Sequence, residues 1–200
     1  MLTETATRPD ECVLVFGIPT SREAFLRDRD RPDKDFTRRF AGLWRRYDDE
    51  VAGPLRAVEP ELTGRGVSVE HDTTLARFGE LLQHEKYRVV ILFSHWHKNM
   101  VEFADAMTAA DDIVAIVPED FSGVLDLCVC HPEGLTESIR AERPRCRMRF
   151  CRGAATPFFW LSFYRALFEH LDGANISYLT ALTELAAGLL GTLRGERGTE

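Results

Sequence analysis

The sequence lacks several features that would assign it to a function class at once. No apolar run approaches the roughly 20 residues that a membrane-spanning helix needs, and the amino terminus has neither the basic nor the apolar region of a secretory signal. There is also no Gly-x-Ser-x-Gly motif of the α/β-hydrolases and no glycine-rich loop in the strand–loop–helix setting that phosphate binding requires. We therefore expect neither a membrane partner nor a phosphate-loop enzyme.

Positive charge is also scarce. The chain has 25 Lys and Arg residues against 32 Asp and Glu residues, which gives a net charge of −7. Nonspecific binding of nucleic acid needs a basic surface, so no nucleic-acid partner is expected. The five cysteines are an odd number in a chain without an export signal. They indicate reduced thiols and a cytoplasmic protein.

What is present is an ordinary globular composition, with 44% apolar and 28% charged residues. A chain of 200 residues buries about 70% of its unfolded surface when it folds. This is enough for one self-sufficient core. We expect a single domain over residues 1–200, with loose segments at 1–11 and 191–200.

Predicted strands and helices alternate along the chain. Apolar segments predict strands at 12–16, 66–70, 89–93, 100–103, 124–130 and 147–151. Helical spacing of apolar residues predicts helices at 35–51, 74–84, 108–117, 156–171 and 177–190. Residues 20–35 are expected to form a loop or short helix, and 138–145 a polar connection. This alternation is typical of an α/β fold, here a three-layer α/β/α sandwich with a mainly parallel sheet.

Two of the predicted strands end in residues that can carry out chemistry. His95 follows the strand at 89–93, and Cys130 ends the strand at 124–130. Ligands of parallel sheets bind beyond the carboxyl ends of the strands, so both side chains are expected at one edge if the strands are neighbours. An imidazole beside a thiol can generate the nucleophilic thiolate. A Cys130–His95 catalytic dyad is therefore a hypothesis that the sequence supports.

Each member of the dyad has a rival nearby. Cys128 lies two residues before Cys130, on the same face of the strand. Cys130 is preferred because it stands at the end of the strand and is followed by a break. His97 shares the face of His95 but lies deeper in the following loop.

A zinc site is the main rival from another class of proteins. The residues of zinc-ligand type in this part of the chain are Cys128, Cys130, His131, Cys146 and Cys151. Their spacing does not form paired Cys-x-x-Cys motifs, and two thiols within one strand offer a poor bite for a metal ion. We therefore expect no metal and no other cofactor.

At these residues the chain resembles a known family. The segment Ile91–His95 looks like the strand followed by Ser-His in caspase-like peptidases, and residues 99–107 correspond to the short hairpin that follows it there. Residues 124–132 resemble the strand that delivers the catalytic cysteine. The pair Cys130-His131 is also similar to the Cys-His pair of metacaspases.

The carboxyl-terminal part extends this likeness. Residues 163–167 and 176–182 resemble the pattern of CHAT domains, which are bacterial caspase-like peptidases related to separase. The likeness covers roughly residues 12–190 and implies a caspase-hemoglobinase-like fold. It implies a cysteine endopeptidase without a metal, with Cys130 as nucleophile and His95 as its base, and a role in a bacterial defence or regulated-death pathway.

The resemblance also implies partners and further site residues. The substrate would be a protein, and the oxyanion donors would be the backbone amides of Cys130 and Trp96. Asp105, Asp126 and Glu102 are candidate substrate-binding acids. Asp126 would line the specificity pocket only if Cys128, and not Cys130, were the nucleophile. The negative net charge favours cleavage after a basic residue over an acidic one.

Two departures from the family pattern favour an alternative. Trp96 stands where the family prefers glycine after the histidine, and it is expected to crowd the site or to form part of its substrate-binding wall. His131-Pro132 replaces the small residues after the cysteine. The alternative is a catalytically inactive caspase-like interaction module. The aromatic segment Phe158–Tyr164 is apolar around nearly the whole helix, which indicates burial or else a surface for a partner or a second copy.

A domain without a recognisable sensor suggests activation by a protein partner or an upstream protease. Caspase-like zymogens are often cut between the cysteine strand and the next strand. Arg140, Arg143 and Arg145 lie in that interval. A solvated connection is the preferred interpretation of these arginines, and a processing segment is the alternative.

Overall fold

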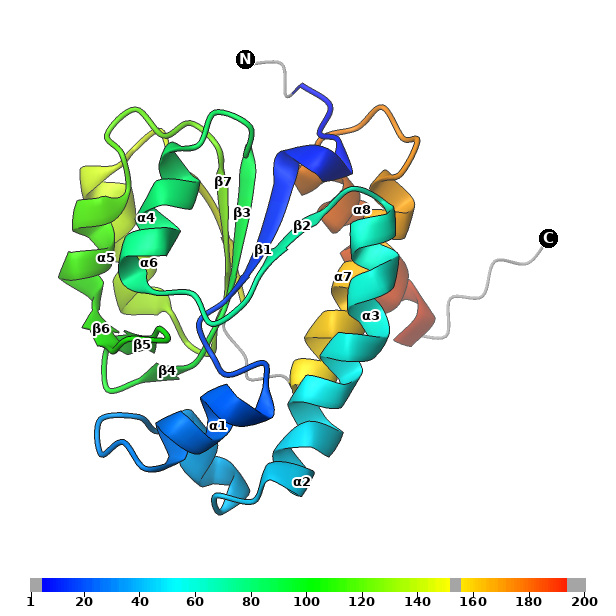
Figure 1. Ribbon diagram of the computed structural model, residues 1–200. Coiled ribbons are helices and arrows are strands. Elements are labelled where there is room, and N and C mark those ends of the chain that lie inside the picture. The colour runs from blue at the N-terminus through cyan, green and yellow to red at the C-terminus, as the bar shows by residue number, and fades with distance from the viewer. Residues whose placement is uncertain (1–4, 152–155, 194–200) are drawn as a thin grey trace.

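The computed structural model describes residues 5–151 and 156–193, which form an α/β fold around one central sheet. The strands of this sheet are β1 (Cys12–Phe16), β2 (Ser68–Glu70), β3 (Val89–Phe93), β7 (Val124–Cys128) and β8 (Arg147–Phe150). Their order is β2-β1-β3-β7-β8, and every neighbouring pair is parallel. The predicted α/β class with a parallel sheet is confirmed (Figure 1).

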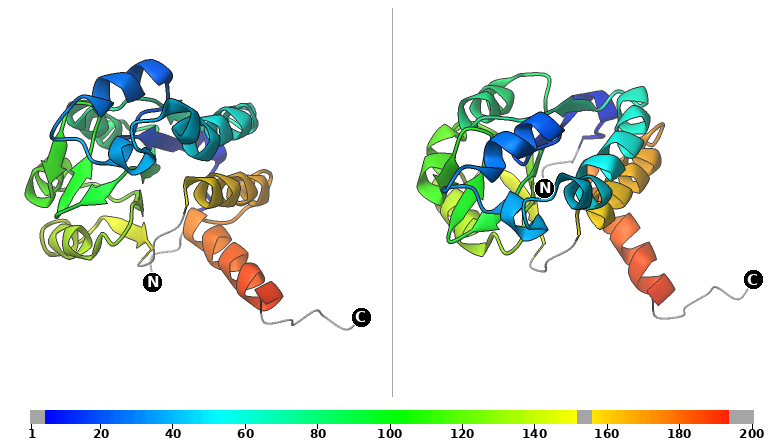
Figure 2. Two further views of the ribbon diagram at one scale, coloured as in Figure 1. Left: turned by 90° about the horizontal axis from the view of Figure 1, so that it is seen from below. Right: turned by 60° about the horizontal axis from the view of Figure 1, so that its bottom comes forward.

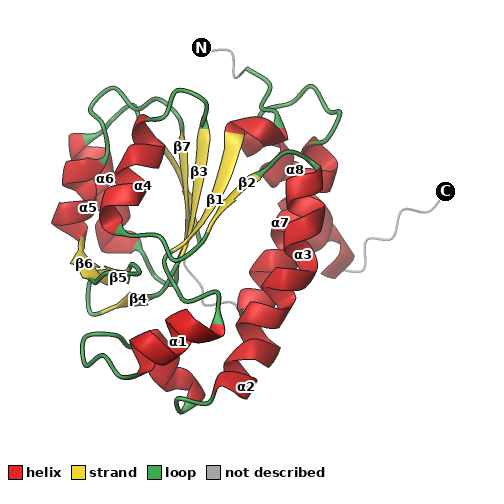
Figure 3. Ribbon diagram, viewed as in Figure 1, coloured by secondary structure: helices red, strands yellow, loops and turns green. Residues whose placement is uncertain are grey.

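Helices cover both faces of the sheet (Figure 3). The α-helices are α1 (Arg22–Arg29), α2 (Trp44–Tyr47), α3 (Gly53–Gly64), α4 (Leu75–Gln83), α5 (Ala110–Ile116), α6 (Glu133–Glu142), α7 (Pro157–Leu171) and α8 (Tyr178–Leu193). Short 3-10 segments lie at η1 (Pro9–Glu11) and η2 (Phe36–Phe40), and a π-type turn at η3 (Asp48–Ala52). The core on one face comes mainly from α3 and α7, with α8 beside them, and the core on the other from α4, α5 and α6. The result is three layers.

The strands β1 and β3 are continuous apolar runs because both of their faces are buried. In β1, Leu14 points into the core under α3 and α7, whereas Val13 and Val15 point into the core under α4. All five residues of β1 are buried, as are all five of β3 and of β7. The predicted strands at 12–16 and 89–93 match the structure residue for residue.

A second, small sheet follows β3. It is antiparallel and consists of β4 (Trp96–His97), β5 (Met100–Glu102) and β6 (Met107–Ala109). Lys98 and Asn99 connect β4 to β5, and both are left-handed, with φ of 49° and 63°. Two successive left-handed residues form the type I′ turn that best matches the twist of a two-strand hairpin. The hairpin therefore begins directly after His95.

The helix expected over 35–51 is wrong in its continuity. Ala41 and Gly42 are left-handed, with φ of 52° and 67°, which ends η2 and turns the chain before α2. Helical structure also continues past the expected end at residue 51, because α3 follows η3 directly and runs on to Gly64. Pro54 lies in the first turn of α3, which follows the π-type turn without a break.

Two segments expected to be irregular are more ordered than predicted. Residues 138–142 belong to α6, and only 143–146 form a connection to β8. Near the amino terminus, the Thr7 N–H donates to the carbonyl of Ile176 (2.9 Å), and its hydroxyl accepts from the N–H of Tyr178 (3.1 Å). Residues 7–11 are thus attached to the start of α8. The expected loose segments at 1–4 and 194–200 lie outside the described residues.

The arrangement of the remaining elements leaves one edge of the sheet for a site. Figures 1 and 2 place α1 and α2 next to the carboxyl ends of the strands, with the small sheet beside them. The end of α8 projects away from the layers (Figure 2). Across the described part of the chain, none of the helices has the length and apolar character needed to cross a membrane.

Candidate active site

His95 and Cys130 occupy equivalent positions on neighbouring strands. β3 and β7 pair in parallel, and Phe93 lies opposite Cys128. Each candidate lies two residues beyond that pair. The N–H of Ser94 still donates to the carbonyl of Cys128 (3.3 Å), so the two strands stay together to this point. The shared register brings both candidates to the carboxyl edge of the sheet, where ligands of parallel sheets bind.

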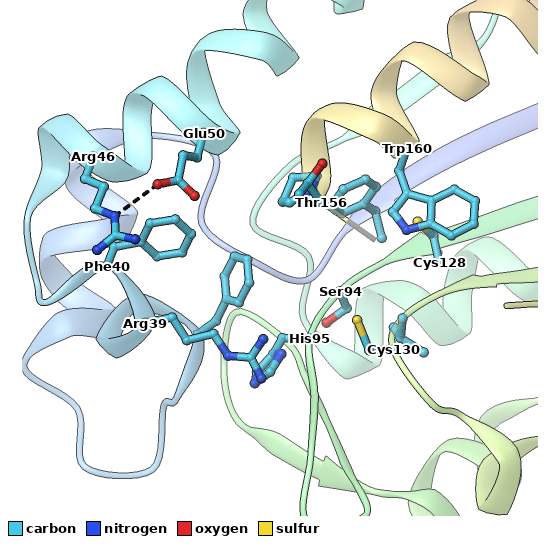
Figure 4. Close-up of a pocket in the computed structure, with 14 residues that line it drawn as sticks. Arg39, Phe40, Arg46, Glu50, Ser94, His95, Cys128, Cys130, Thr156 and Trp160 are labelled. Carbon is cyan, nitrogen blue, oxygen red and sulfur yellow. Dashed lines mark hydrogen bonds and ion pairs between the residues drawn. The ribbon is translucent and has the colours of Figure 1, made fainter. Parts of the chain in front are cut away.

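Both residues line the same cavity, which has a volume of about 370 Å³. Figure 4 draws the cavity with Ser94, His95 and Cys130 along one side, and the start of α7 with Trp160 along another. Phe36 also lines it, so the walls are largely aromatic. Apolar walls with a few convergent polar groups are typical of a binding or catalytic pocket.

The two cysteines of this strand differ in accessibility. Cys128 also lines the cavity, but only 3% of it is exposed, and burial raises the pKa of its thiol well above the usual value. Cys130 is only partly buried. Because the thiolate is the reactive form of cysteine, burial makes Cys128 the poorer nucleophile. The geometry therefore favours Cys130.

The chain turns sharply directly after Cys130. His131 is left-handed, with φ of 53°, a conformation that is uncommon outside glycine and in which asparagine, aspartate and histidine are enriched. α6 then begins at Glu133. The first N–H groups of a helix have no partner within it, so this turn brings backbone donors close to Cys130.

Asp35 is the site residue that sequence reasoning missed. Its Oδ2 lies 3.2 Å from Nε2 of His95, although the two residues are 60 positions apart. The same oxygen lies 3.5 Å from Nδ1 of His97. Burial raises the pKa of Asp35, but the hydrogen bond from His95 and the nearby charges of His97 and Arg39 outweigh this and hold it below the usual value. No local pattern marks Asp35, which stands in a charged segment at the start of an expected helix.

The carboxylate of Asp35 determines which nitrogen of His95 is available. A carboxylate only accepts hydrogen bonds, so the proton of a neutral His95 is assigned to Nε2. Nδ1 then carries a lone pair. His95 is 2% exposed, and burial, followed by the charge of Arg39, lowers its pKa to about 4. The ring is therefore neutral near pH 7.

A buried ionic network holds the chain on both sides of Asp35. Lys34 is fully buried, with Nζ 3.6 Å from Asp28 Oδ2 and 3.8 Å from Glu102 Oε1, and it donates to the carbonyl of Phe103. The other oxygen of Glu102 accepts from the N–H of Phe36 (3.2 Å). Burial raises the pKa of Glu102 to about 7, although the charge of Lys34 opposes the shift.

The acids expected to bind substrate do not line the cavity of His95 and Cys130. Asp126 is fully buried, and its two oxygens accept from Arg149 (2.9 Å) and Tyr178 (2.6 Å). Asp105 accepts from the N–H of Leu75 at the start of α4 (3.2 Å). Both carboxylates have structural partners that the sequence did not indicate.

Trp96 also lies elsewhere. It is half-buried, packs against the core under α4 and α5, and borders a separate hollow with Asn99 and Ser138. Its side chain is therefore not a wall of the cavity. Of the candidate side chains, the structure brings together His95 and Cys130, with His97 close by through Asp35.

The charged residues that do line the cavity are Arg39, Arg46 and Glu50. Arg46 is paired with Glu50 at 3.0 Å (Figure 4). Two positive charges and one negative charge do not form an acidic pocket. The expected preference for a basic cleavage residue has no support from the side chains around the cavity.

The aromatic segment of α7 is mostly buried. Trp160, Leu161, Phe163 and Tyr164 face the core, whereas Phe158 is 62% and Phe159 46% exposed. Burial thus accounts for most of this segment.

The suggested zinc ligands are not gathered into one site. Among the described residues, no three of Cys128, Cys130, His131, Cys146 and Cys151 lie close enough together to hold a metal ion. One group with metal-ligand geometry does occur there, and it consists of Asp35, His95 and His97.

The chain was compared with known proteins. No protein-family model matches it, and no curated protein matches it. The chemistry of the site is therefore argued from its geometry.

Proposed function

We propose that the protein is a cytoplasmic cysteine endopeptidase of the caspase-like, CHAT type, with Cys130 as nucleophile and His95 as general base. The observation that carries the proposal is the placement of both side chains in one cavity, at equivalent positions beyond the paired ends of β3 and β7. The strand order and the short antiparallel hairpin after the histidine support the family resemblance.

The reaction would proceed by acyl transfer. Nδ1 of His95 takes the proton from Sγ of Cys130, and the thiolate attacks the carbonyl carbon of the scissile peptide bond. The tetrahedral oxyanion collapses, the C–N bond breaks, and His95 returns its proton to the leaving amine. A thioester remains on Cys130. Water attacks it, His95 accepts a proton from that water, and the carboxylic acid leaves as the thiol is restored.

Asp35 acts in this scheme as a positioning residue. Its hydrogen bond to Nε2 keeps the His95 proton on the side away from the cavity. It also stabilises the imidazolium that forms when Nδ1 takes up the thiol proton. The buried ion pairs of Lys34 keep Asp35 beside the ring.

The oxyanion needs donors at the place where negative charge develops. The backbone amides of Cys130 and Trp96 are the proposed donors. The turn at His131 directs the main chain after Cys130 back toward α6. Removing one such donor typically reduces a rate by roughly a hundredfold or more.

The substrate would be a protein, and a partner or an upstream protease would activate the enzyme in a defence or regulated-death pathway. Arg143 donates to the carbonyl of Val117 (2.7 Å), and Arg140 stacks on Phe150. Both arginines are thus held by α6 and its neighbours. Arg145 is exposed and lies in the connection to β8, outside any helix or strand, so it is the proposed processing position.

Alkylation by iodoacetamide tests the proposal. Cys130 of the wild type should react fastest, Cys130→Ala should lose that fast phase, and His95→Ala should slow it roughly a hundredfold, the usual range for a general base. Cys128→Ala is the matched control and should keep the fast phase. Circular dichroism of each variant checks that it has folded. Equal and slow labelling in all four proteins would refute the dyad, and cleavage of a peptide library by the wild type alone would support the endopeptidase.

A catalytically inactive interaction module is the second candidate. The exposed Phe158 and Phe159 favour it, because they form an apolar surface at the start of α7, beside the cavity. Folded variants that label equally slowly, together with a partner lost on Phe158→Ser, would support this alternative.

A further inference from the structure

A second feature of the site involves His95 and two residues, Asp35 and His97, that do not line the cavity of Cys130. Oδ2 of Asp35 is 3.2 Å from Nε2 of His95 and 3.5 Å from Nδ1 of His97. All three atoms lie within 4.8 Å of one another. A tetrahedral zinc ion with bonds of about 2.0–2.1 Å separates its ligand atoms by about 3.3 Å. Two of the three separations already have this value to within a few tenths of an ångström.

We propose that Asp35, His95 and His97 bind a divalent transition-metal ion of the Zn²⁺ class, and that this ion reversibly inactivates Cys130 by occupying His95. The metal site stands on its own geometry, whereas the inhibition rests on the proposed function. Two imidazole nitrogens and one carboxylate oxygen suit zinc and its transition-metal neighbours. Calcium and magnesium prefer sites made of oxygen ligands alone.

The three ligands are held in place before any metal arrives. His97 lies on β4, paired with Met100 across the two-residue type I′ turn. His95 is buried, and its ring stacks on that of His97 with centroids 6.1 Å apart. Asp35 is fixed through its neighbours, the buried Lys34 and the N–H of Phe36. Sites on rigid elements lose little entropy when they bind.

The site is also accessible from solvent. The side chains of Asp35 and His97 are 28% and 35% exposed, and both border a hollow of about 330 Å³. This hollow can admit an ion with a water molecule as fourth ligand. Arg38 and Lys98 line it too. Their positive charges oppose a cation, so the affinity should be that of a regulatory site and not of a permanent structural zinc.

Metal binding would change what His95 can do for Cys130. When the ion takes Nε2, the proton that Nε2 shares with Asp35 moves to Nδ1. Nδ1 then carries the proton as an N–H donor and cannot accept the thiol proton. Asp35 is drawn into the same coordination shell and no longer orients the ring. The thiol of Cys130 stays protonated until a chelator removes the ion.

Binding is tested first, without reference to activity. The full chain is titrated with Zn²⁺ by calorimetry, and with Co²⁺ by visible absorption, where four-coordinate Co²⁺ absorbs strongly. We expect one ion per chain. His97→Ala and Asp35→Asn should each weaken binding at least roughly tenfold, since even the loss of an outer-shell partner costs that much. His170→Ala, which removes an exposed histidine paired with Glu184, is the matched control and should bind like the wild type.

Cys130→Ser separates this site from the obvious rival, in which zinc binds the thiol and the imidazole directly. We expect Cys130→Ser to keep the wild-type affinity and the same Co²⁺ spectrum. Loss of binding in Cys130→Ser, or unchanged binding in both His97→Ala and Asp35→Asn, would overturn the proposed site. These measurements remain decisive even if Cys130 proves to be unreactive.

The inhibition is tested by the ratio of Cys130 alkylation rates with and without Zn²⁺. Zinc should slow alkylation of the wild type at least roughly tenfold, and a chelator should restore the full rate. His97→Ala should need at least roughly ten times more zinc for the same slowing. His170→Ala should follow the wild type. Metal bound to the three ligands with no change in the alkylation rate would refute the inhibitory role while leaving the site intact.

Discussion

Two buried ionic networks flank the candidate site, and they differ in how well their carboxylates are satisfied. On the side of Cys130, both oxygens of Asp126 receive a hydrogen bond, from Arg149 and from Tyr178. On the side of His95, Lys34 is ion-paired with Asp28 and Glu102, but Asp28 Oδ2 and Glu102 Oε1 accept no hydrogen bond from the described residues. Burial raises the pKa of Asp126 and of Glu102.

The difference separates a structural network from one that can respond to conditions. A buried charge pair with every lone pair satisfied mainly secures packing, whereas an under-satisfied one leaves a group free to change protonation. Arg149 also lies over the ring of Trp160, 4.4 Å from its centroid, and so connects β8 to the wall of the cavity. The network of Lys34 instead holds Asp35, and through it His95.

The largest effect on stability is expected in the network of Asp126, whose two carboxylate oxygens both accept hydrogen bonds. Arg149→Met leaves the carboxylate of Asp126 buried without its cation, and we expect the free energy of unfolding to fall by about 3–5 kcal/mol. Urea denaturation followed by circular dichroism measures it. The double variant Asp126→Leu with Arg149→Met removes both charges and should recover much of the loss. A double variant as unstable as the single one would contradict this account.

The second-largest effect is expected in the network of Lys34, where the stability should depend on pH through Glu102. Because burial raises the pKa of Glu102 to about 7, the folded state holds a proton that the unfolded chain releases above its ordinary pKa of 4.5. Compared with Glu102→Gln, the wild type should therefore lose up to about 3 kcal/mol of stability between pH 4.5 and about pH 7. Denaturation of both proteins at a series of pH values tests this. A constant difference across that range would show that Glu102 is ionised throughout.

A smaller effect is expected where the His95-side network meets the chemistry. Asp35→Asn should slow alkylation of Cys130 by roughly tenfold, about 1.4 kcal/mol, because an amide no longer fixes the proton of His95 on Nε2. The pH profile of alkylation should shift with it, which a merely structural change would not cause. Asp35→Glu should restore part of the rate. Unchanged rate and profile in Asp35→Asn would remove Asp35 from the mechanism.

The smallest effect should come from an ion pair outside both networks. Arg46 and Glu50 lie one helical turn apart and are 58% and 51% exposed. Arg46→Ala should lower the stability by no more than about 0.5 kcal/mol, since exposed pairs are screened by water and salt. Thermal denaturation in low and high salt measures this. A loss comparable to that of Arg149→Met would mean that charge pairing, and not burial, sets the ranking of these variants.

Much of the fold could be predicted because it depends on local patterns. The runs at Cys12–Phe16 and Val89–Phe93 are apolar on both faces. This pattern is typical of a strand that lies between two layers of helices. Thr156 and Pro157 likewise start α7 as expected, with the threonine side chain capping the helix. The stripe from residue 36 to 51 is misleading, because its apolar residues have helical spacing although the left-handed Ala41 and Gly42 interrupt the helix.

By itself, the sequence determined the order of the elements, the parallel sheet, and the placement of a histidine and a cysteine after two of its strands. These follow from periodicity and from the polarity of neighbouring residues. Only the tertiary structure decided that Asp35 meets His95 across 60 positions, that Asp126 is bound to Arg149 and Tyr178, and that His97 joins the first pair. The contacts of Asp35 and His97 depend on how loops fold over the edge of the sheet, and those of Asp126 on the pairing of β7 with β8 and the packing of α8. No local period encodes either.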